Sequence, residues 1–435
     1  MNNNRNIMNT HFRAVIAAAL IFVTTLMLFS QIALAEAGSM IPIGDPNAEP
    51  PELKAKAAAL YSLDLDRVVY SKNENKKMSP YSITKILTCY LAIENLWLDE
   101  EVTVSADATQ AYENGTTIYL KEGEKIRVCD LVYGALLASG NDAAYALGEA
   151  VSGSEKDFAD LMNKTVSEWG CKDTHFVNAN GWKNDEHYTT AHDMSIIAAK
   201  CFENVSLLTM SLEKEYTIPE TNMTEARQLK NYFLSAVKKV NGITGGKTGS
   251  WSEDDCSIAL QFEKDGLKAV VILLGDTHKS RAKDVKKLID FSPVVTPGFL
   301  VSDKGDIVTT ARVRHGEITK AELSVDGATV AYPASNDTKD IEVVTDIDKL
   351  EAPLSKGDKA GTYKVFVDGS LVGEHDLVMA EDVETGWFPS YLYISNRQTM
   401  IIAFALLCLL FLIMVINRVK KAGKKPAGKH DKTGK

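Results

Sequence analysis

A run of seventeen residues without a charged side chain, Met400 to Ile416, constrains this chain more than any other stretch. At a rise of about 1.5 Å per residue, a helix of that length spans roughly 25 Å, close to the thickness of the hydrocarbon core of a bilayer. Eight Lys and Arg and one Asp follow in residues 417–435. Because basic residues flank the cytoplasmic end of a membrane span, the pattern predicts a transmembrane helix at 400–416 and a basic cytoplasmic tail at 417–435. A buried core helix is the alternative.

The N-terminus has the pattern of a secretory signal. Arg5 and Arg13 precede a long apolar run, and small residues stand at positions 33 and 35. These features predict a signal peptide over 1–35, cleaved after Ala35. A retained membrane anchor is the alternative. Together the two apolar segments predict a cell-membrane protein with a single span and an extracytoplasmic domain.

The charge is unevenly distributed along the chain. Of the overall net charge of −10, the tail contributes +7 and the leader +2, which leaves −19 for the segment between them. So acidic a segment argues against nucleic acid as a partner. No CxxC pair and no histidine cluster with zinc spacing is present, so no metal site, cofactor or disulfide framework is predicted. The cysteines are Cys89, Cys129, Cys171, Cys201, Cys256 and Cys408.

The outer segment divides at a linker. Alternating apolar residues predict two hairpins, at 57–72 and at 256–275, the second with its turn at Asp265-Gly266. Apolar periodicity predicts helices from Ser82, on both sides of 139–141, and over 279–291. We therefore expect an α/β (α+β) domain at 36–292, with an antiparallel sheet packed against helices. Prolines and a glycine at 292–298 indicate the linker. Short alternating stretches then predict an all-β domain at 298–383, and a juxtamembrane linker at 384–399 carries an aromatic belt. The belt comprises Trp387, Phe388, Tyr391 and Tyr393.

Three short motifs occur in order within the first domain. They are "SITK" at 82–85, "SGN" at 139–141, and "KTG" at 247–249, which we expect to open a strand. Each is weak alone, because "SLEK" and "SAVK" recur at 211–214 and 235–238, and "KTG" recurs in the tail. The ordered set within one extracytoplasmic domain is the strong signal.

The spacing suits nucleophilic catalysis. A serine hydroxyl needs a base, and Lys85, at i+3 on a helix, faces the same side as Ser82. A lysine acts as a base only when it is neutral, which requires burial and a nearby cation, for which Lys247 is the candidate. Ser139 could relay the proton to a leaving amine, and Asn141 could hold the lysine and the substrate amide by hydrogen bonds.

Substrate-binding groups follow the same logic. The helix start at Ser82 offers backbone N–H groups to an oxyanion, and Ser250 is expected to supply the second donor. Gly249, like the glycines before it, leaves room for a substrate backbone along the strand. Lys247 and Thr248 are placed to hold a terminal carboxylate.

This constellation resembles the penicillin-recognising serine enzymes. It is most similar to the low-molecular-mass penicillin-binding proteins, the D-alanyl-D-alanine carboxypeptidases, and "HFVNANGW" (175–182), "LLGDTHKSR" (273–281) and residues 352–378 extend the similarity over about 50–385. The resemblance implies a transpeptidase-like catalytic domain with Ser82 as the acylated nucleophile, Lys85 as the base, Ser139 and Asn141 as the second element, and Lys247 with Thr248 as the third. It implies removal of the terminal D-alanine from peptidoglycan stem peptides ending in D-Ala-D-Ala, and inhibition by β-lactams. This chain departs from the family pattern at two points. It has Ser250-Trp251 where the family pattern leads us to expect His-Thr. It is also predicted to cross the membrane, whereas relatives often end in an amphipathic helix that lies on the membrane.

Two other functions fit part of the pattern. A β-lactamase would need a carboxylate to activate the deacylating water, for which Glu186 is the candidate. A non-catalytic penicillin-binding wall sensor would keep the pocket without needing a neutral lysine beside a serine. Arg281 is expected to be a surface helix charge rather than a carboxylate ligand. His187 and His192 are expected to be structural.

Overall fold

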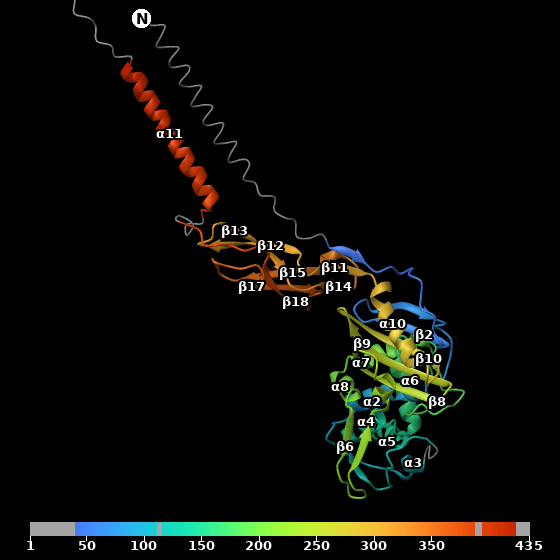
Figure 1. Ribbon diagram of the computed structural model, residues 1–435. Coiled ribbons are helices and arrows are strands. Elements are labelled where there is room, and N and C mark those ends of the chain that lie inside the picture. Colours follow the sequence, from blue (N-terminus) through green and yellow to red (C-terminus); the bar gives the residue numbers. More distant parts are fainter. Residues whose placement is uncertain (1–39, 111–114, 388–393, 423–435) are drawn as a thin grey trace, which may run out of the picture.

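The computed structural model describes residues 40–110, 115–387 and 394–422. A helix-flanked lobe, a β domain and a long C-terminal helix follow one another in space, with the β domain in the middle (Figure 1). The predicted signal peptide and most of the predicted aromatic belt lie outside the described residues.

A five-stranded antiparallel sheet forms the centre of the first lobe. Its order is β3-β2-β10-β9-β8, so β3 and β8 are the two edge strands. The predicted hairpin turn at Asp265-Gly266 is confirmed, since both residues adopt positive φ, at 51° and 78°. The strands are β2 (Ala57–Ser62), β3 (Arg67–Lys72), β8 (Ile243–Ser252), β9 (Asp255–Lys264) and β10 (Leu267–Asp276).

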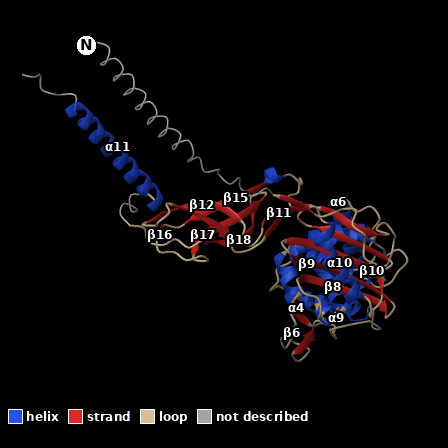
Figure 2. Cartoon of the chain, turned by 45° about the horizontal axis from the view of Figure 1, so that its top comes forward, coloured by secondary structure: helices blue, strands red, loops and turns tan. Residues whose placement is uncertain are grey.

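Helices cover both faces of this sheet (Figure 2). Alternate residues of β10 face opposite sides, so that Ile272 belongs to the core with α2, α4, α5, α6 and α7, and Val271 to the core with α10. The predicted antiparallel sheet packed with helices is therefore confirmed. The helices of this lobe are η1 (Tyr81–Thr84, a 3₁₀ turn), α2 (Lys85–Asn95), α3 (Ala106–Gln110), α4 (Val128–Leu136), α5 (Asn141–Ser152), α6 (Glu155–Glu168), α7 (Ala191–Phe202), α8 (Val205–Ser211), α9 (Tyr232–Val237) and α10 (Arg281–Val295). Two small sheets pair β4 (Glu101–Thr103) with β5 (Lys125–Arg127), and β6 (Glu215–Ile218) with β7 (Arg227–Lys230).

Two expected boundaries were wrong. The KTG motif lies within β8 rather than at its start, because Gly245 and Gly246 already pair with β9. Helix α10 runs through Pro293 into the stretch interpreted as a linker. Proline has no N–H for the carbonyl of Ile289, and the hydroxyl of Ser292 donates to that oxygen instead, at 2.8 Å.

The β domain is built on a six-stranded sheet of order β15-β17-β18-β13-β12-β16, with its own buried core. A three-stranded sheet, β1-β11-β14, joins the N-terminal strand to this domain, with Ile41 opposite Leu300. The elements are β1 (Ile41–Ile43), β11 (Gly298–Ser302), β12 (Ile307–Arg314), β13 (Lys320–Val325), β14 (Thr329–Ala331), η2 (Thr338–Asp340), β15 (Ile341–Ile347), β16 (Leu350–Glu351), β17 (Lys359–Val367) and β18 (Ser370–Met379).

Helix α11 (Asn396–Ala422) contains the predicted span. Within the described part of the chain, it is the one helix long and apolar enough to cross a membrane, over Asn396–Arg418. Its apolar side chains between Met400 and Val415 are largely exposed.

Candidate active site

Ser82 and Lys85 meet where the 3₁₀ turn η1 passes into helix α2. Lys85 Nζ lies 2.9 Å from Ser82 Oγ. The sequence predicted a helix from Ser82, but the α-helix begins at Lys85. The serine therefore stands in the tighter 3₁₀ turn just before the helix. The side chain of Ser82 is half-buried, whereas Lys85 is fully buried.

Two further oxygens fix the amine of Lys85. It donates to Asn141 Oδ1 at 2.8 Å and to the backbone oxygen of Asn180 at 2.6 Å. Burial, and next the charge of Lys247, hold the pKa of Lys85 well below its usual range. The lysine beside the serine therefore favours the neutral form that a base requires.

A second hydrogen-bonded group surrounds Lys247. Its Nζ lies 3.0 Å from Ser139 Oγ and donates to the backbone oxygen of Thr248 at 2.9 Å. Burial lowers the pKa of Lys247 to about 7. The structure thus gathers the three motifs into two groups, one of Ser82, Lys85 and Asn141, the other of Ser139, Lys247 and Thr248.

Strand β8 lies directly against the serine turn. A Cβ on Gly249 would stand 2.7 Å from the backbone nitrogen of Ser82 and 2.9 Å from the oxygen of Pro80, distances that only glycine avoids. From the neighbouring strand, the Ser257 hydroxyl donates to Pro80 O at 2.5 Å. Gly249 is therefore the residue that lets the strand and the nucleophile segment touch.

The backbone is strained at two site positions. Tyr81 and Ser139 have φ values of 55° and 59°, a region that residues other than glycine seldom adopt. The hydroxyl of Tyr81 donates to Asp255 Oδ2 at 2.7 Å, and Thr116 Oγ1 donates to the backbone oxygen of Ser139 at 2.7 Å. These bonds hold both residues in place.

The loop at 175–190 supplies groups whose roles the sequence did not predict. The Asn180 oxygen reaches Lys85, and a Cβ on Gly181, whose φ is 80°, would stand 1.9 Å from the oxygen of Tyr81. His187 is buried with Nε2 3.0 Å from Thr84 Oγ1, and burial lowers its pKa to about 3, so it is neutral. The stretch "HFVNANGW" was the sequence signal for this loop, but a contact made by a backbone oxygen cannot be inferred from residue types.

Two residues lie at the margin of these groups. Ser250 follows Gly249 in β8, and its side chain is exposed. Arg281 is a helix residue, as expected, at the first position of α10, but its side chain is less exposed than that of an ordinary surface charge. Its guanidinium is half-buried, with Nε lacking a hydrogen-bond partner among the described residues, and its charge helps to lower the pKa of Lys247.

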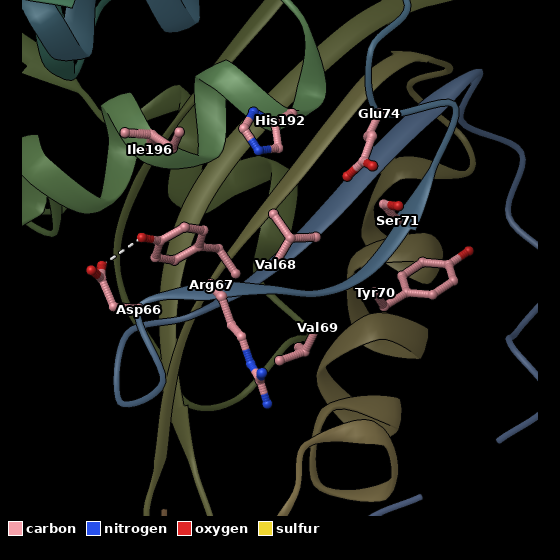
Figure 3. A pocket seen from close by; sticks show the side chains of 10 residues that line it. Asp66, Arg67, Val68, Val69, Tyr70, Ser71, Glu74, His192 and Ile196 are labelled. Carbon is pink, nitrogen blue, oxygen red and sulfur yellow. Dashed lines mark hydrogen bonds between the residues drawn. The ribbon is translucent and has the colours of Figure 1, made fainter. Parts of the chain in front are cut away.

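A separate pocket lies at the opposite edge of the sheet, between β3 and α7 (Figure 3). Arg67, Glu74 and His192 line it, and Tyr61 donates to Asp66 at 2.6 Å. None of the eight predicted site residues lines this pocket.

The architecture and the site together define a class, the penicillin-binding proteins. Penicillin-binding protein 5 of Haemophilus influenzae has the same fold, with a TM-score of 0.54 and 24% identity over 78% of this chain and all of that structure. A serine-to-alanine mutant of the Streptomyces K15 DD-transpeptidase is 26% identical, with a TM-score of 0.51 over 55% of this chain and 98% of that one.

Family models narrow the class. The model described as D-alanyl-D-alanine carboxypeptidase, peptidase family S11, matches residues 45–277, and the model of the penicillin-binding protein 5 C-terminal domain matches 299–385. The D-alanyl-D-alanine carboxypeptidase DacF of Bacillus subtilis is 31% identical over 358 residues, 78% of this chain and 88% of that protein. DacA of Escherichia coli is 27% identical over 355 residues, 78% of this chain and 86% of that protein. The chain belongs to the D-alanyl-D-alanine carboxypeptidase family and is a serine-type carboxypeptidase.

Proposed function

We propose that the chain is a membrane-anchored carboxypeptidase that removes the terminal D-alanine of peptidoglycan stem peptides through an acyl-enzyme on Ser82. The observation that carries the proposal is the buried amine of Lys85, 2.9 Å from Ser82 Oγ and tied to two other oxygens. The catalytic unit extends to the end of α10 at Val295, three residues beyond the predicted boundary at 292, and the β domain spans 298–383.

The hydrogen bonds of Lys85 suit a general base. A neutral amine has two N–H donors and one lone pair. With the donors directed to Asn141 Oδ1 and Asn180 O, the lone pair is left for the hydroxyl proton of Ser82. Lys85 then accepts that proton as Ser82 Oγ attacks the carbonyl carbon of the penultimate D-alanine.

The remaining groups complete the reaction. The N–H groups of Ser82 and Ser250 stabilise the oxyanion, because Gly249 brings the two segments together. Ser139, beside Lys247, relays a proton to the leaving amine, and the C–N bond breaks to release D-alanine. Water then hydrolyses the ester and regenerates Ser82.

Cationic groups face the terminal carboxylate. Lys247 and Thr248 hold it from β8, and the half-buried Arg281 adds a second positive charge. Penicillins carry a carboxylate and a reactive amide in a similar arrangement, so they acylate the same serine and inhibit the enzyme.

Helix α11 anchors the protein in the membrane, with the catalytic lobe outside and the basic tail in the cytoplasm. Its length, its exposed apolar surface and the eight basic residues behind Ile416 support this topology. The β domain holds the catalytic lobe away from the bilayer (Figure 1).

The test uses the full-length protein in detergent. It is incubated with labelled penicillin, the modified residue is mapped by mass spectrometry, and D-alanine release from a D-Ala-D-Ala peptide is measured in parallel. We expect a label on Ser82 and release of D-alanine, with both lost in Ser82→Ala. A label without release would instead support a wall sensor, and rapid hydrolysis of the penicillin a β-lactamase.

A further inference from the structure

An aromatic surface lies beside the nucleophile. Trp251, two residues beyond Gly249 in β8, is 49% exposed although it is a large apolar side chain. Its ring lies 6.4 Å from that of Tyr81, nearly parallel, and 5.4 Å from that of Trp182 in an edge-to-face arrangement. Because Tyr81 precedes Ser82, this surface, formed by Tyr81, Trp182 and Trp251, borders the place where the substrate reacts.

Strand direction indicates which part of the substrate meets Trp251. Strand β8 is an edge strand, so an extended peptide can add to it in antiparallel orientation. Under the proposed function, on which this inference rests, the terminal carboxylate lies at Lys247-Thr248 and the reacting carbonyl at the Ser250 N–H. The chain of an antiparallel peptide then continues toward Trp251. The residue before D-Ala-D-Ala therefore places its side chain near the indole.

Trp251 has a basic side chain beside its ring and acidic residues close to it in the sequence. Lys183 Nζ lies 5.5 Å from the centre of the indole ring, and none of the ion pairs among the described residues includes it. On the strand side, the turn after Trp251 carries exposed Glu253 and Asp254. The next carboxylate, Asp255, already accepts from Tyr81.

We propose that Trp251 and Lys183 select the side chain of the residue that precedes D-Ala-D-Ala. The chemical class is a diamino dicarboxylic acid, whose long aliphatic chain ends in both a carboxylate and an amino group. The methylene groups pack on the indole, the carboxylate pairs with Lys183, and the amino group faces Glu253 and Asp254. A lysine-type side chain has no carboxylate to offer Lys183.

The experiment compares three peptides X-D-Ala-D-Ala, in which X is L-alanine, L-lysine or meso-diaminopimelic acid linked through its L-centre. The quantity measured is kcat/KM for D-alanine release, expressed as a ratio to the L-alanine peptide for each variant. We expect the wild type to favour the diaminopimelyl over the lysyl peptide by about fivefold, the upper range for one exposed ion pair. Lys183→Glu should reverse that preference. Trp251→Ala should bring both ratios toward one.

Trp97→Ala is the matched control, since Trp97 is 84% exposed and lies beyond the end of α2, outside the site. It should leave all ratios unchanged. An unchanged lysyl-to-diaminopimelyl ratio in Lys183→Glu would overturn the proposed selection, as would equal losses on all three peptides in Trp251→Ala. Failure of the proposed function looks different, because the wild type would then release D-alanine from none of the peptides and carry no penicillin label on Ser82.

Discussion

Substituting Gly249 with alanine tests how closely β8 must approach the nucleophile. The added Cβ would lie 2.5 Å from Ser257 Oγ, 2.7 Å from Ser82 N and 2.9 Å from Pro80 O. Ordinary contact begins at 3.4 Å, so the Ser82 segment must withdraw by roughly 0.7 Å. A misplacement of 1 Å at a reacting group costs about 100-fold in rate. We therefore expect acylation to slow by roughly 10- to 100-fold, and overpacking to destabilise the lobe by about 1–3 kcal/mol.

The assay is the second-order rate constant for acylation of Ser82 by a fluorescent penicillin, with thermal unfolding followed in parallel. Gly316→Ala is the control, because its Cβ would stand 2.7 Å from Ile318 O, an equally tight clash in the β domain. This control should lose stability and keep its acylation rate. A folded Gly249→Ala protein that acylates within twofold of the wild type would refute the argument.

Other predictions concern charge, deacylation and anchoring. Burial first, and then the charge of Lys247, lower the pKa of Lys85. In Lys247→Gln the pKa of Lys85 should therefore rise, and the acidic limb of the plot of acylation rate against pH should move to higher pH. An unmoved limb would contradict the electrostatic coupling of the two lysines. The unfolded chain holds the Lys247 proton up to about pH 10.5 and the folded chain only to about 7, so Lys247 adds to the unfolding free energy as the pH rises over that window. In urea titrations the rise should be smaller in Lys247→Gln than in the wild type, and an equal rise would contradict the lowered pKa. Glu186→Gln should hydrolyse its penicilloyl-enzyme at the wild-type rate, since the Glu186 side chain is exposed, and a large slowing would favour a β-lactamase. A chain ending before Asn396 should leave the membrane fraction yet keep D-alanine release, and retention on membranes would disprove anchoring by α11.

Local patterns predicted much of the fold. The hairpin at Asp265-Gly266 and the helices on either side of 139–141 follow from turn chemistry and apolar spacing, which act over a few residues. The start of β8 was missed because paired glycines resemble a break. In the structure Gly246 lies where a Cβ would meet Phe233 at 2.5 Å, so the absent side chain makes room for a helix.

The site was predictable only where side chains carry it. Ser82, Lys85 and Lys247 could be inferred, because their residue types are required by the chemistry. The role of the Asn180 carbonyl could not be inferred, since every residue has a carbonyl group. Its orientation toward Lys85 depends on the positive φ of the next residue, Gly181. The partial burial of Arg281 depends on how α10 meets the sheet, which helical periodicity does not specify.

The short strand β1 bears on the order in which the chain folds. It is made before the catalytic lobe, yet its partner residues on β11 are made roughly 260 residues later. None of the buried residues of the lobe's two cores belongs to β1, although Ile43 packs against one of them, so most of the lobe can fold before Ile41 pairs with Leu300. Closing so long a loop in an already folded chain costs less entropy than closing it in an unfolded one. Pairing of β1 is thus a late event, and a protease that cuts near Pro42 would distinguish newly made molecules from finished ones.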